Sequence, residues 1–345
     1  MLNMKKLLAV GVVMFIIAGF VNSSQASTVE GYDIDKAKYV LKAGHVLAEN
    51  HPYHQSLLYM DEYLCKATNG ELRIEVYPNS QLGNERDLQE GCSMGTVDIG
   101  IGATATLSNF TKDFTLFDLP YLFTSKQEAR SVLHGDWAQQ KLAELKSLDM
   151  IGLTFWEAGM FDIMQQSHPV TKMSEFPGLT IRVMENDVFI KTMVALGINP
   201  VPMAWSEVFT SIQNGTVDGT SNPPVTLYTS SIQSIAKYFT VANMIYSPIP
   251  VIMSKITYDG LPAEYQALMY EAAEAASAVE YKLIDEMEKE AFAAFKEAGV
   301  EVTYFTEEQI AECKELMQDK VWPQFVGSSV SQDDIDAINK IVAGL

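Results

Sequence analysis

Hydrophobic positions near the start of the chain alternate between short strand-like runs and longer amphipathic stretches. Residues 38–43 are predicted as a strand, and His51-Pro52 opens a helix that runs to Lys66. The stretches ELRIEVYP, NERDLQEGCSMG and VDIGIGA then predict a strand, a helix and a fully buried strand. This strand–helix–strand–helix–strand order is typical of an α/β protein with a mostly parallel sheet.

The same order of elements returns in the second half of the chain. TIRVM predicts a strand, and NDVFIKTMVALG and WSEVFTSIQNG predict helices. The tetrapeptide GTVD occurs in both halves, at residues 95–98 and 215–218. In each place a glycine closes a helix and Thr-Val enters a strand. We therefore predict two similarly wound lobes, each a mostly parallel sheet with helices on both faces.

A helical pattern over residues 262–298 exceeds the length of an ordinary globular helix. Its apolar repeat does not keep coiled-coil spacing, so we expect one long helix that spans both lobes. Two more surface helices are expected in 306–327 and 331–345. Without a Pro/Ser-rich linker, the lobes must be joined by crossing strands. The predicted lobes are residues 27–157 with 246–285, and 158–245 with 286–345.

The first 26 residues have the pattern of a secretory signal peptide. Lys5 and Lys6 precede an apolar run over residues 7–21, and SQA offers small residues at both cleavage positions. An uncleaved membrane anchor is the alternative, and it is disfavoured because the run is short for a membrane span. We therefore predict an exported protein that begins after residue 26.

Composition and charge limit the possible partners. Apolar residues make up 48% and charged residues 20% of the chain, as in ordinary globular proteins. Removing Lys5 and Lys6 changes the formal charge from −20 to −22. Such an acidic surface argues against nucleic acid and anionic lipid as partners. After the leader no other apolar run approaches the ~20 residues of a membrane span, so we expect no insertion of the mature chain.

The sequence carries no pattern of a common catalytic or cofactor site. It lacks G-x-S-x-G, a P-loop and H-E-x-x-H, and we predict neither an enzyme nor a cofactor. His45, His51 and His54 lie close together in sequence, which makes a metal site conceivable. The spacing provides no carboxylate pair on one helical face, and His51 and His54 fit a solvated helix start. We therefore expect no metal.

Three cysteines follow the leader, and an exported protein could join two of them. Cys65 and Cys92 fall on the first two predicted helices, and Cys313 falls near the end of the chain. If the strand order is 2-1-3, right-handed crossovers place the two helices on opposite faces of the sheet. Free thiols are the favoured reading.

Arg182 is the least expected residue in the pattern, because it lies in a strand predicted to be buried. A buried guanidinium without a partner costs several kcal/mol or more. Asn222 follows the second GTVD, and Trp205 begins a predicted helix. In doubly wound sheets, ligands bind beyond the carboxyl ends of the strands. The three residues favour a cleft for a small organic anion. A structural salt bridge for Arg182 and a core position for Trp205 are the alternatives.

The stretch GLTIRVMENDVFIKTMVALGINPVPMAWSEVFTSIQNGTVDGTSNPP resembles the signature region of TRAP (tripartite ATP-independent periplasmic) transporter solute-binding proteins. GHVLAENHPYH, VYPNSQLGNERDLQEG and FDLPYLF are similar to further family stretches, in the expected order. The resemblance implies a two-lobed periplasmic-binding-protein fold with a hinge. It also implies capture of a solute in the periplasm and its delivery to membrane permease subunits. A ligand sensor of the same fold, passing its signal to a membrane partner, is the alternative.

The resemblance also assigns roles to residues of the cleft. It implies that Arg182 pairs with the carboxylate of the solute, that Trp205 packs beside this carboxylate, and that Asn222 is its second ligand. His45 and Tyr121, the latter within FDLPYLF, complete the expected contacts.

Two departures from the family pattern bear on the solute. Many members carry a second arginine where the stretch GMFDIMQ places Phe161, and Ala103 replaces a polar contact of sugar-acid binders. Both changes remove polar contacts. We therefore predict a monocarboxylate with a hydrophobic or aromatic body. The competing possibility is that His45 or Lys172 replaces the missing arginine.

Overall fold

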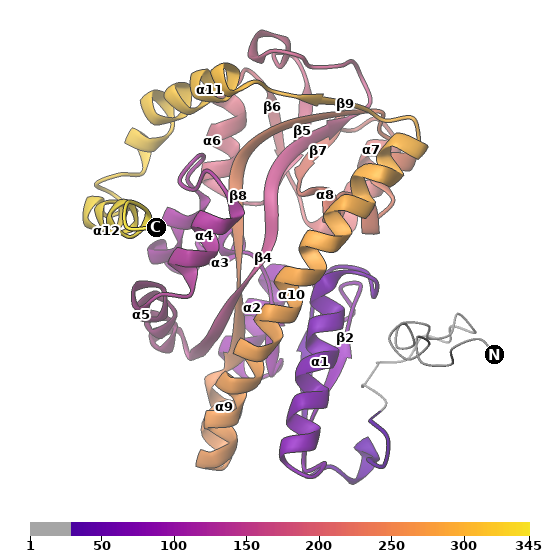
Figure 1. The fold of residues 1–345 in the computed structure, drawn as a ribbon, viewed down its shortest axis with the longest axis vertical. Coiled ribbons are helices and arrows are strands. Elements are labelled where there is room, and N and C mark those ends of the chain that lie inside the picture. The colour runs from indigo at the N-terminus through magenta and orange to yellow at the C-terminus, as the bar shows by residue number, and fades with distance from the viewer. Residues whose placement is uncertain (1–28) are drawn as a thin grey trace, which may run out of the picture.

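The computed structural model describes residues 29–345, in which nine strands form one continuous sheet with helices around it (Figure 1). The strands are β1 (Tyr39–Gly44), β2 (Leu72–Tyr77), β3 (Ile99–Ile101), β4 (Met150–Gln165), β5 (Thr180–Val183), β6 (Asn199–Pro202), β7 (Gly219–Asn222), β8 (Tyr238–Ser254) and β9 (Glu301–Tyr304). The helices are α1 (Pro52–Ala67), α2 (Glu85–Met94), α3 (Thr104–Leu107), α4 (Lys126–Leu133), α5 (Asp136–Glu144), α6 (Asp187–Ala195), α7 (Val208–Gln213), α8 (Pro224–Thr229), α9 (Lys255–Gly260), α10 (Ala263–Glu297), α11 (Glu307–Lys320) and α12 (Gln332–Val342).

The predicted signal peptide, residues 1–26, lies outside the described residues. Within 29–345, none of the helices has the combination of length and apolar character that a bilayer span requires.

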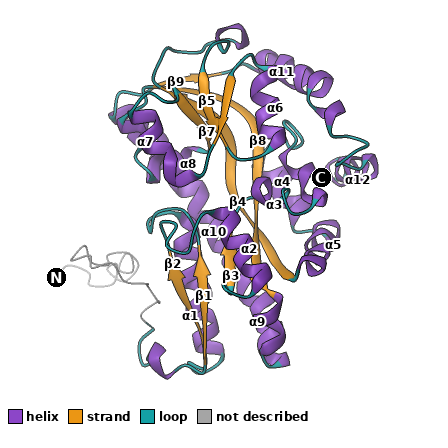
Figure 2. Ribbon diagram, turned by 180° about the vertical axis from the view of Figure 1, so that it is seen from behind, coloured by secondary structure: helices purple, strands orange, loops and turns teal. Residues whose placement is uncertain are grey.

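The sheet has the order β2-β1-β3-β8-β4-β7-β5-β6, and β9 pairs with β8. Strands β1 to β3 lie in one lobe and β5 to β7 with β9 in the other, while β4 and β8 run through both (Figure 2). The two-lobed α/β fold and its crossing strands are therefore confirmed. The sheet is more mixed than predicted, because the crossing strands run in opposite directions. The pairs β3–β8, β8–β4 and β4–β7 are antiparallel, and the other pairs are parallel.

The repeated GTVD has the same structural role in both lobes. Gly95 and Gly215 have φ angles of 78° and 71°, a left-handed conformation that glycine adopts without steric cost. The aspartate that ends each repeat accepts a hydrogen bond from a backbone N–H of a neighbouring parallel strand. Asp98 Oδ2 accepts a hydrogen bond from the backbone N of Lys42 at 2.8 Å, and Asp218 Oδ2 accepts one from that of Thr180 at 2.7 Å. The internal similarity inferred from four residues thus reflects one local structure used twice.

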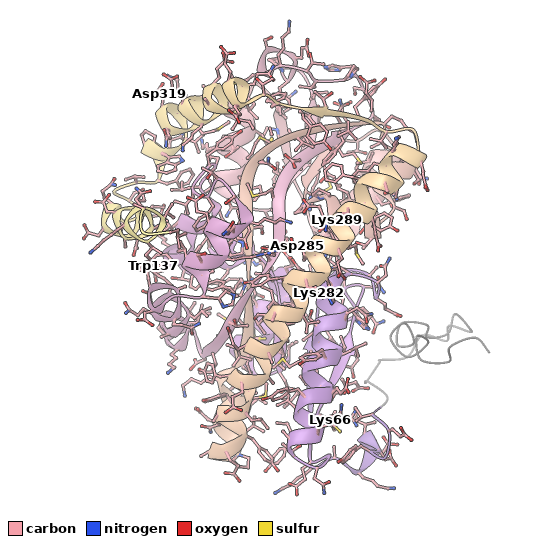
Figure 3. All side chains as sticks on the ribbon, viewed as in Figure 1. Lys66, Trp137, Lys282, Asp285, Lys289 and Asp319 are labelled. Carbon is pink, nitrogen blue, oxygen red and sulfur yellow. The ribbon has the colours of Figure 1, made fainter. Side chains whose placement is uncertain are left out.

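The long helix α10 packs against α1, β4, α8 and β9, so it touches both lobes as predicted (Figure 1). Near its middle, Asp285 (Figure 3) pairs with Arg130 of α4 at 2.8 Å. Arg130 also pairs at 2.5 Å with Glu157, a fully buried residue of β4. These ion pairs tie α4, a crossing strand and the long helix together. The predicted lobe boundaries, at Glu157 and Asp285, fall on this network and stay a prediction.

The three cysteines of the described chain are buried and free, as the sequence predicts. Cys65 lies on α1 and Cys92 on α2. The strands β2, β1 and β3 have the 2-1-3 order that the prediction of free thiols assumed.

Gly219, the first residue of β7, lies directly against the backbone of β4. A Cβ atom added there would lie 2.1 Å from the carbonyl oxygen of Met164 and 2.6 Å from the Cα of Gln165. Backbone cannot yield as a flexible side chain can. We therefore expect Gly219→Ala to lower the free energy of unfolding by at least ~1–3 kcal/mol, measured by urea denaturation. Gly260→Ala is the matched control, because no atom lies within 4 Å of its added Cβ. Equal stability of the two variants would contradict this packing.

Candidate functional site

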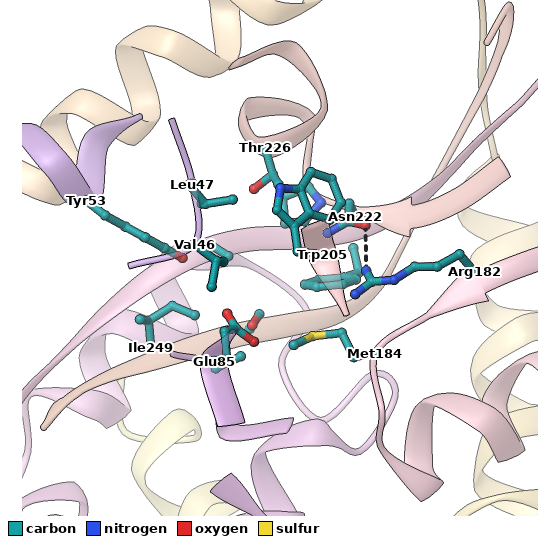
Figure 4. Close-up of a pocket in the computed structure, with 15 residues that line it drawn as sticks. Val46, Leu47, Tyr53, Glu85, Arg182, Met184, Trp205, Asn222, Thr226 and Ile249 are labelled. Carbon is teal, nitrogen blue, oxygen red and sulfur yellow. Dashed lines mark hydrogen bonds between the residues drawn. The ribbon is translucent and has the colours of Figure 1, made fainter. Parts of the chain in front are cut away.

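A cavity of about 390 Å³, a volume that includes space open to solvent, lies between the two lobes (Figure 4). Segments just past β1 and β3 line it from one lobe, and the ends of β5 and β7 line it from the other. The lining residues are Val46, Leu47, Tyr53, Glu85, Ala103, Ala158, Phe161, Arg182, Met184, Trp205, Asn222, Pro223, Thr226, Ser247 and Ile249. The cavity therefore lies beyond the carboxyl ends of parallel strands, where doubly wound sheets bind ligands.

Arg182 is buried at the end of β5, with its guanidinium at the cavity wall. Its Nε and Nη2 donate to the carbonyl oxygen of Met203 at 3.0 and 2.8 Å, and Nη1 donates to Asn222 Oδ1 at 3.2 Å. A guanidinium has five N–H groups, so one donor on each Nη remains. Two parallel donors of this kind match the two oxygens of a carboxylate.

The charge of Arg182 is only partly compensated, because Glu85, Glu185 and Glu207 raise its pKa without forming an ion pair with it. No carboxylate of residues 29–345 lies within ion-pair distance of its guanidinium, and burial lowers the pKa of Arg182 to about 10. The other fully buried arginine is different, because Arg73 forms a bidentate pair with buried Asp61 at 2.9 and 2.8 Å. The structure thus excludes an internal salt bridge for Arg182 within its described part.

Asn222 ends β7 with its side-chain amide between Arg182 and the cavity. Its Oδ1 accepts from Arg182 Nη1 and, at 2.7 Å, from Thr220 Oγ1. The acceptor end of the amide is thereby occupied, and no bond from Nδ2 to the described residues is found. Nδ2 is left as a third donor beside the two of the guanidinium.

Aromatic rings form much of the remaining wall. Half-buried Trp205 has its ring centroid 5.5 Å from the Cζ of Arg182, which is cation–π distance. The sequence predicted one helix starting at Trp205. The structure has a short 3-10 helix, Trp205–Glu207, followed by α7. Phe161 is buried and packs edge-on against Phe189, with ring centroids 5.0 Å apart. These rings limit the water that can reach the guanidinium.

Glu85 is the first residue of α2, and it reaches the cavity from the lobe opposite Arg182 (Figure 4). Burial raises the pKa of Glu85 to about 7. The charge of Arg182 and hydrogen bonds from Ala103 and Thr106 oppose this rise, and the nearby charge of Glu185 adds to it. The cavity therefore has a cation on one wall and a titratable acid on the other.

Comparison with known proteins connects this geometry to a family. The family model described as bacterial extracellular solute-binding protein, family 7, matches residues 43–327. The C4-dicarboxylate-binding periplasmic protein DctP of Rhodobacter capsulatus is 34% identical over 280 residues, which cover 81% of this chain and 84% of that protein. The chain belongs to the DctP family of TRAP-transporter solute-binding proteins. Members of this family are transport proteins and not enzymes.

Solved structures of TRAP solute-binding proteins share the fold. The sugar acid binding protein of Advenella mimigardefordensis, in complex with galactonate, has a TM-score of 0.86 at 27% identity, over 89% of this chain and 99% of that one. A TRAP periplasmic solute-binding protein from Desulfovibrio salexigens, with bound orotic acid, has a TM-score of 0.85 at 25% identity, over the same shares of the two chains.

The structure brings four of the predicted site residues of this TRAP protein together. Arg182, Asn222, Trp205 and Phe161 all line the cavity. Tyr121 does not line it, because its hydroxyl donates to the carbonyl oxygen of Ala242 at 3.2 Å on the inner side of the protein. Tyr121 has a φ of 59° and packs in the core instead.

His45 and Lys172 also lie away from the cavity of the TRAP protein. His45 Nε2 lies 3.1 Å from His54 Nδ1, and both rings are buried. Lys172 is exposed and pairs with Glu175 at 3.7 Å. Neither is positioned to replace the missing arginine within this cavity.

The expectation that His51 and His54 form a solvated helix start is wrong. Both are buried at the start of α1, and burial lowers the pKa of His51 to about 3 and of His54 to about 4. The helix start lies under the cavity wall, which removes it from water. Among residues 29–345, no group of three His, Cys, Asp or Glu side chains has a geometry suited to a metal ion.

Several residues of the site were not foreseen. Glu85, Tyr53, Met184, Thr226 and Ser247 contribute polar and apolar atoms to the cavity wall. The sequence contained a signal for Glu85 and Tyr53, because each lies in the first turn of a predicted helix that follows a parallel strand. Such helix starts meet at the carboxyl edge of the sheet. The other three could not be selected from their local sequence.

If Arg182 anchors a carboxylate, Arg182→Lys should weaken binding at least tenfold. The lysine keeps the charge and loses the two-donor fork, and tenfold corresponds to about 1.4 kcal/mol. Isothermal titration calorimetry with an organic acid such as phenylpyruvate measures the change. An unchanged affinity would show that the fork does not hold the ligand.

A matched pair of variants separates binding from folding. Arg182→Met removes a charge without an internal counter-ion, and it should abolish binding with a small change in the Tm of the ligand-free protein. Arg73→Met removes the guanidinium that neutralises buried Asp61, which costs about 3–5 kcal/mol of stability. An equal loss of Tm in both variants would favour a structural role for Arg182.

Proposed function

We propose that the protein captures a monocarboxylate with a hydrophobic or aromatic body in this cavity. It does so in the periplasm, after export through the predicted signal peptide, and delivers the acid to the membrane permease of a TRAP transporter. Arg182, Asn222, Trp205 and Phe161 are the proposed ligand contacts. The family supports the location and the permease, and the named relatives bind carboxylic acids.

The observation that carries the proposal is the buried charge of Arg182, which has no carboxylate at ion-pair distance in residues 29–345. A buried cation costs several kcal/mol unless an anion meets it, and residues 29–345 provide no such anion at ion-pair distance. One N–H on each Nη and the Nδ2 of Asn222 make no hydrogen bond to the described residues, and both side chains line the cavity. An incoming carboxylate accepts from all three, which makes it the natural partner.

The remainder of the wall favours an uncharged body. Among the described residues lining the main cavity, Arg182 is the single cation. A second carboxylate would lie against Phe161 and Trp205 without a partner, at a cost of several kcal/mol. An apolar group buried in the same space would contribute about 25 cal/mol of binding free energy per Å² of buried area. Stacking of an aromatic ring would add about 0.5–1.5 kcal/mol.

One feature favours a dicarboxylate as the second candidate. Arg86 lines a smaller cavity that adjoins the first and also includes Arg182 and Trp205. Arg86 pairs with Glu90 at 3.1 Å and is exposed to solvent, so its charge is screened and already compensated. The R. capsulatus relative is named for C4-dicarboxylates, which makes the comparison with succinate the decisive one.

Phenylpyruvate or indole acetate should bind at least tenfold more tightly than succinate. The physical reason is the absence of a second cation beside the aromatic wall. Side-by-side titration calorimetry at one pH and salt concentration measures the difference. Tighter binding of succinate would refute the monocarboxylate proposal while leaving the solute-binding function in place.

Phe161→Arg should move this preference toward succinate, because it adds a cation to the wall. Phe161→Leu is the control, since it keeps the position apolar and should retain the preference. The Tm of each variant shows whether it is folded before its affinities are compared. If folded Phe161→Arg keeps the natural preference between phenylpyruvate and succinate, the second carboxylate does not bind beside position 161.

Binding should take up a proton at Glu85. The pKa of Glu85 is raised to about 7, mainly by burial, and the charge of Arg182 keeps it from rising further. A carboxylate bound to Arg182 cancels that charge, so the pKa of Glu85 rises further on binding. Affinity should therefore fall as the pH rises above about 7. Calorimetry at pH 7.5 in buffers of different ionisation enthalpy measures the uptake. Glu85→Gln should remove it, and persistent uptake in that variant would assign the proton to another group.

A further inference from the structure

Asn222 can bind a carboxylate only through Nδ2, because a carboxylate accepts hydrogen bonds and does not donate them. Its amide must therefore be held with the oxygen away from the ligand. Two donors hold this oxygen in the structure. Arg182 Nη1 lies 3.2 Å from Oδ1, and Thr220 Oγ1 lies 2.7 Å from it.

The sheet register brings these donors together. In the parallel pair of β5 and β7, Arg182 is the register partner of Thr220. Asn222 follows Thr220 by two residues, so both side chains leave the strand on the same face. Thr220 is fully buried and is absent from the described lining of both cavities that include Arg182. Its hydroxyl can thus reach Asn222 without touching a ligand.

The two donors have different roles. A guanidinium only donates, so Arg182 decides which end of the amide carries the oxygen. Arg182 also has to meet the ligand, and its bond to Oδ1 is the longer of the two. Thr220 has no such second task, and its bond holds the amide whether or not ligand is present.

We propose that Thr220 is a positioning residue of the carboxylate site, which acts by fixing the side chain of Asn222. This inference rests on the proposed function, in which Asn222 donates to the bound carboxylate. Thr220→Val keeps the shape and removes the hydroxyl. A neutral hydrogen bond contributes enough to expect roughly twofold to tenfold weaker binding of phenylpyruvate.

A double-mutant cycle tests the route of this effect. Thr220→Val should weaken binding in the natural chain and change it less than twofold in an Asn222→Ala background. The same factor in both backgrounds would overturn the proposal. Thr220→Ser should restore binding, because it restores the hydroxyl. Thr192→Val is the matched control, since this buried hydroxyl donates to Val188 O at 2.8 Å and should leave binding unchanged.

A measurement without ligand separates this inference from the proposed function. The 15N relaxation of the Asn222 side-chain amide in the ligand-free protein reports its mobility on the ps–ns timescale. Thr220→Val should increase this mobility, and Thr220→Ser should not. An amide equally rigid in Thr220→Val would overturn the positioning role. Failure of every tested carboxylate to bind the natural chain would instead count against the proposed function.

Discussion

The buried charge of Arg182 is the constraint on which the rest of the site depends. The described chain offers it two uncharged acceptors, the carbonyl oxygen of Met203 and Oδ1 of Asn222, and no carboxylate at ion-pair distance. The low pKa of about 10 reflects this incomplete compensation, yet the group stays protonated at neutral pH. Within residues 29–345, the guanidinium is therefore bonded to neutral acceptors, and acids act on it only beyond ion-pair distance.

Two other arginines, buried Arg73 and half-buried Arg130, have carboxylate partners, unlike Arg182 at the cavity. Arg73 is neutralised by Asp61, and Arg130 by Glu157 and Asp285. Those pairs fasten a strand to a helix, or a crossing strand to α10, where fixed geometry serves stability. Under the proposed function, the ligand supplies the counter-ion in the cavity. The contrast explains how one structure can be rigid along its crossing elements and incomplete where its lobes meet.

Local contacts must overcome an unfavourable long-range field. A chain with a formal charge of −20 repels small anions at a distance, and salt screens this repulsion beyond about 10 Å. Inside the cavity, the rings of Trp205 and Phe161 reduce contact with water, and charge-assisted hydrogen bonds strengthen accordingly. Under the proposed function, the occupancy of the site depends on the protonation of Glu85 on the opposite wall, because burial raises the pKa of Glu85 to about 7.

The sequence by itself determined the order and type of most elements, because these depend on local periodicity, caps and turns. It also singled out Arg182, whose charge conflicts with a buried strand, and the two GTVD turns. Tertiary structure decided which side chains meet. Arg182, Thr220 and Asn222 share one face of the sheet because of the register of β5 and β7. Glu85 lies opposite them because the two lobes face each other across the cavity. His45 was misplaced for the same reason, since only packing reveals that its partner is His54. Neighbour distances across a sheet or a cleft arise from the whole chain, and no local window of sequence contains them.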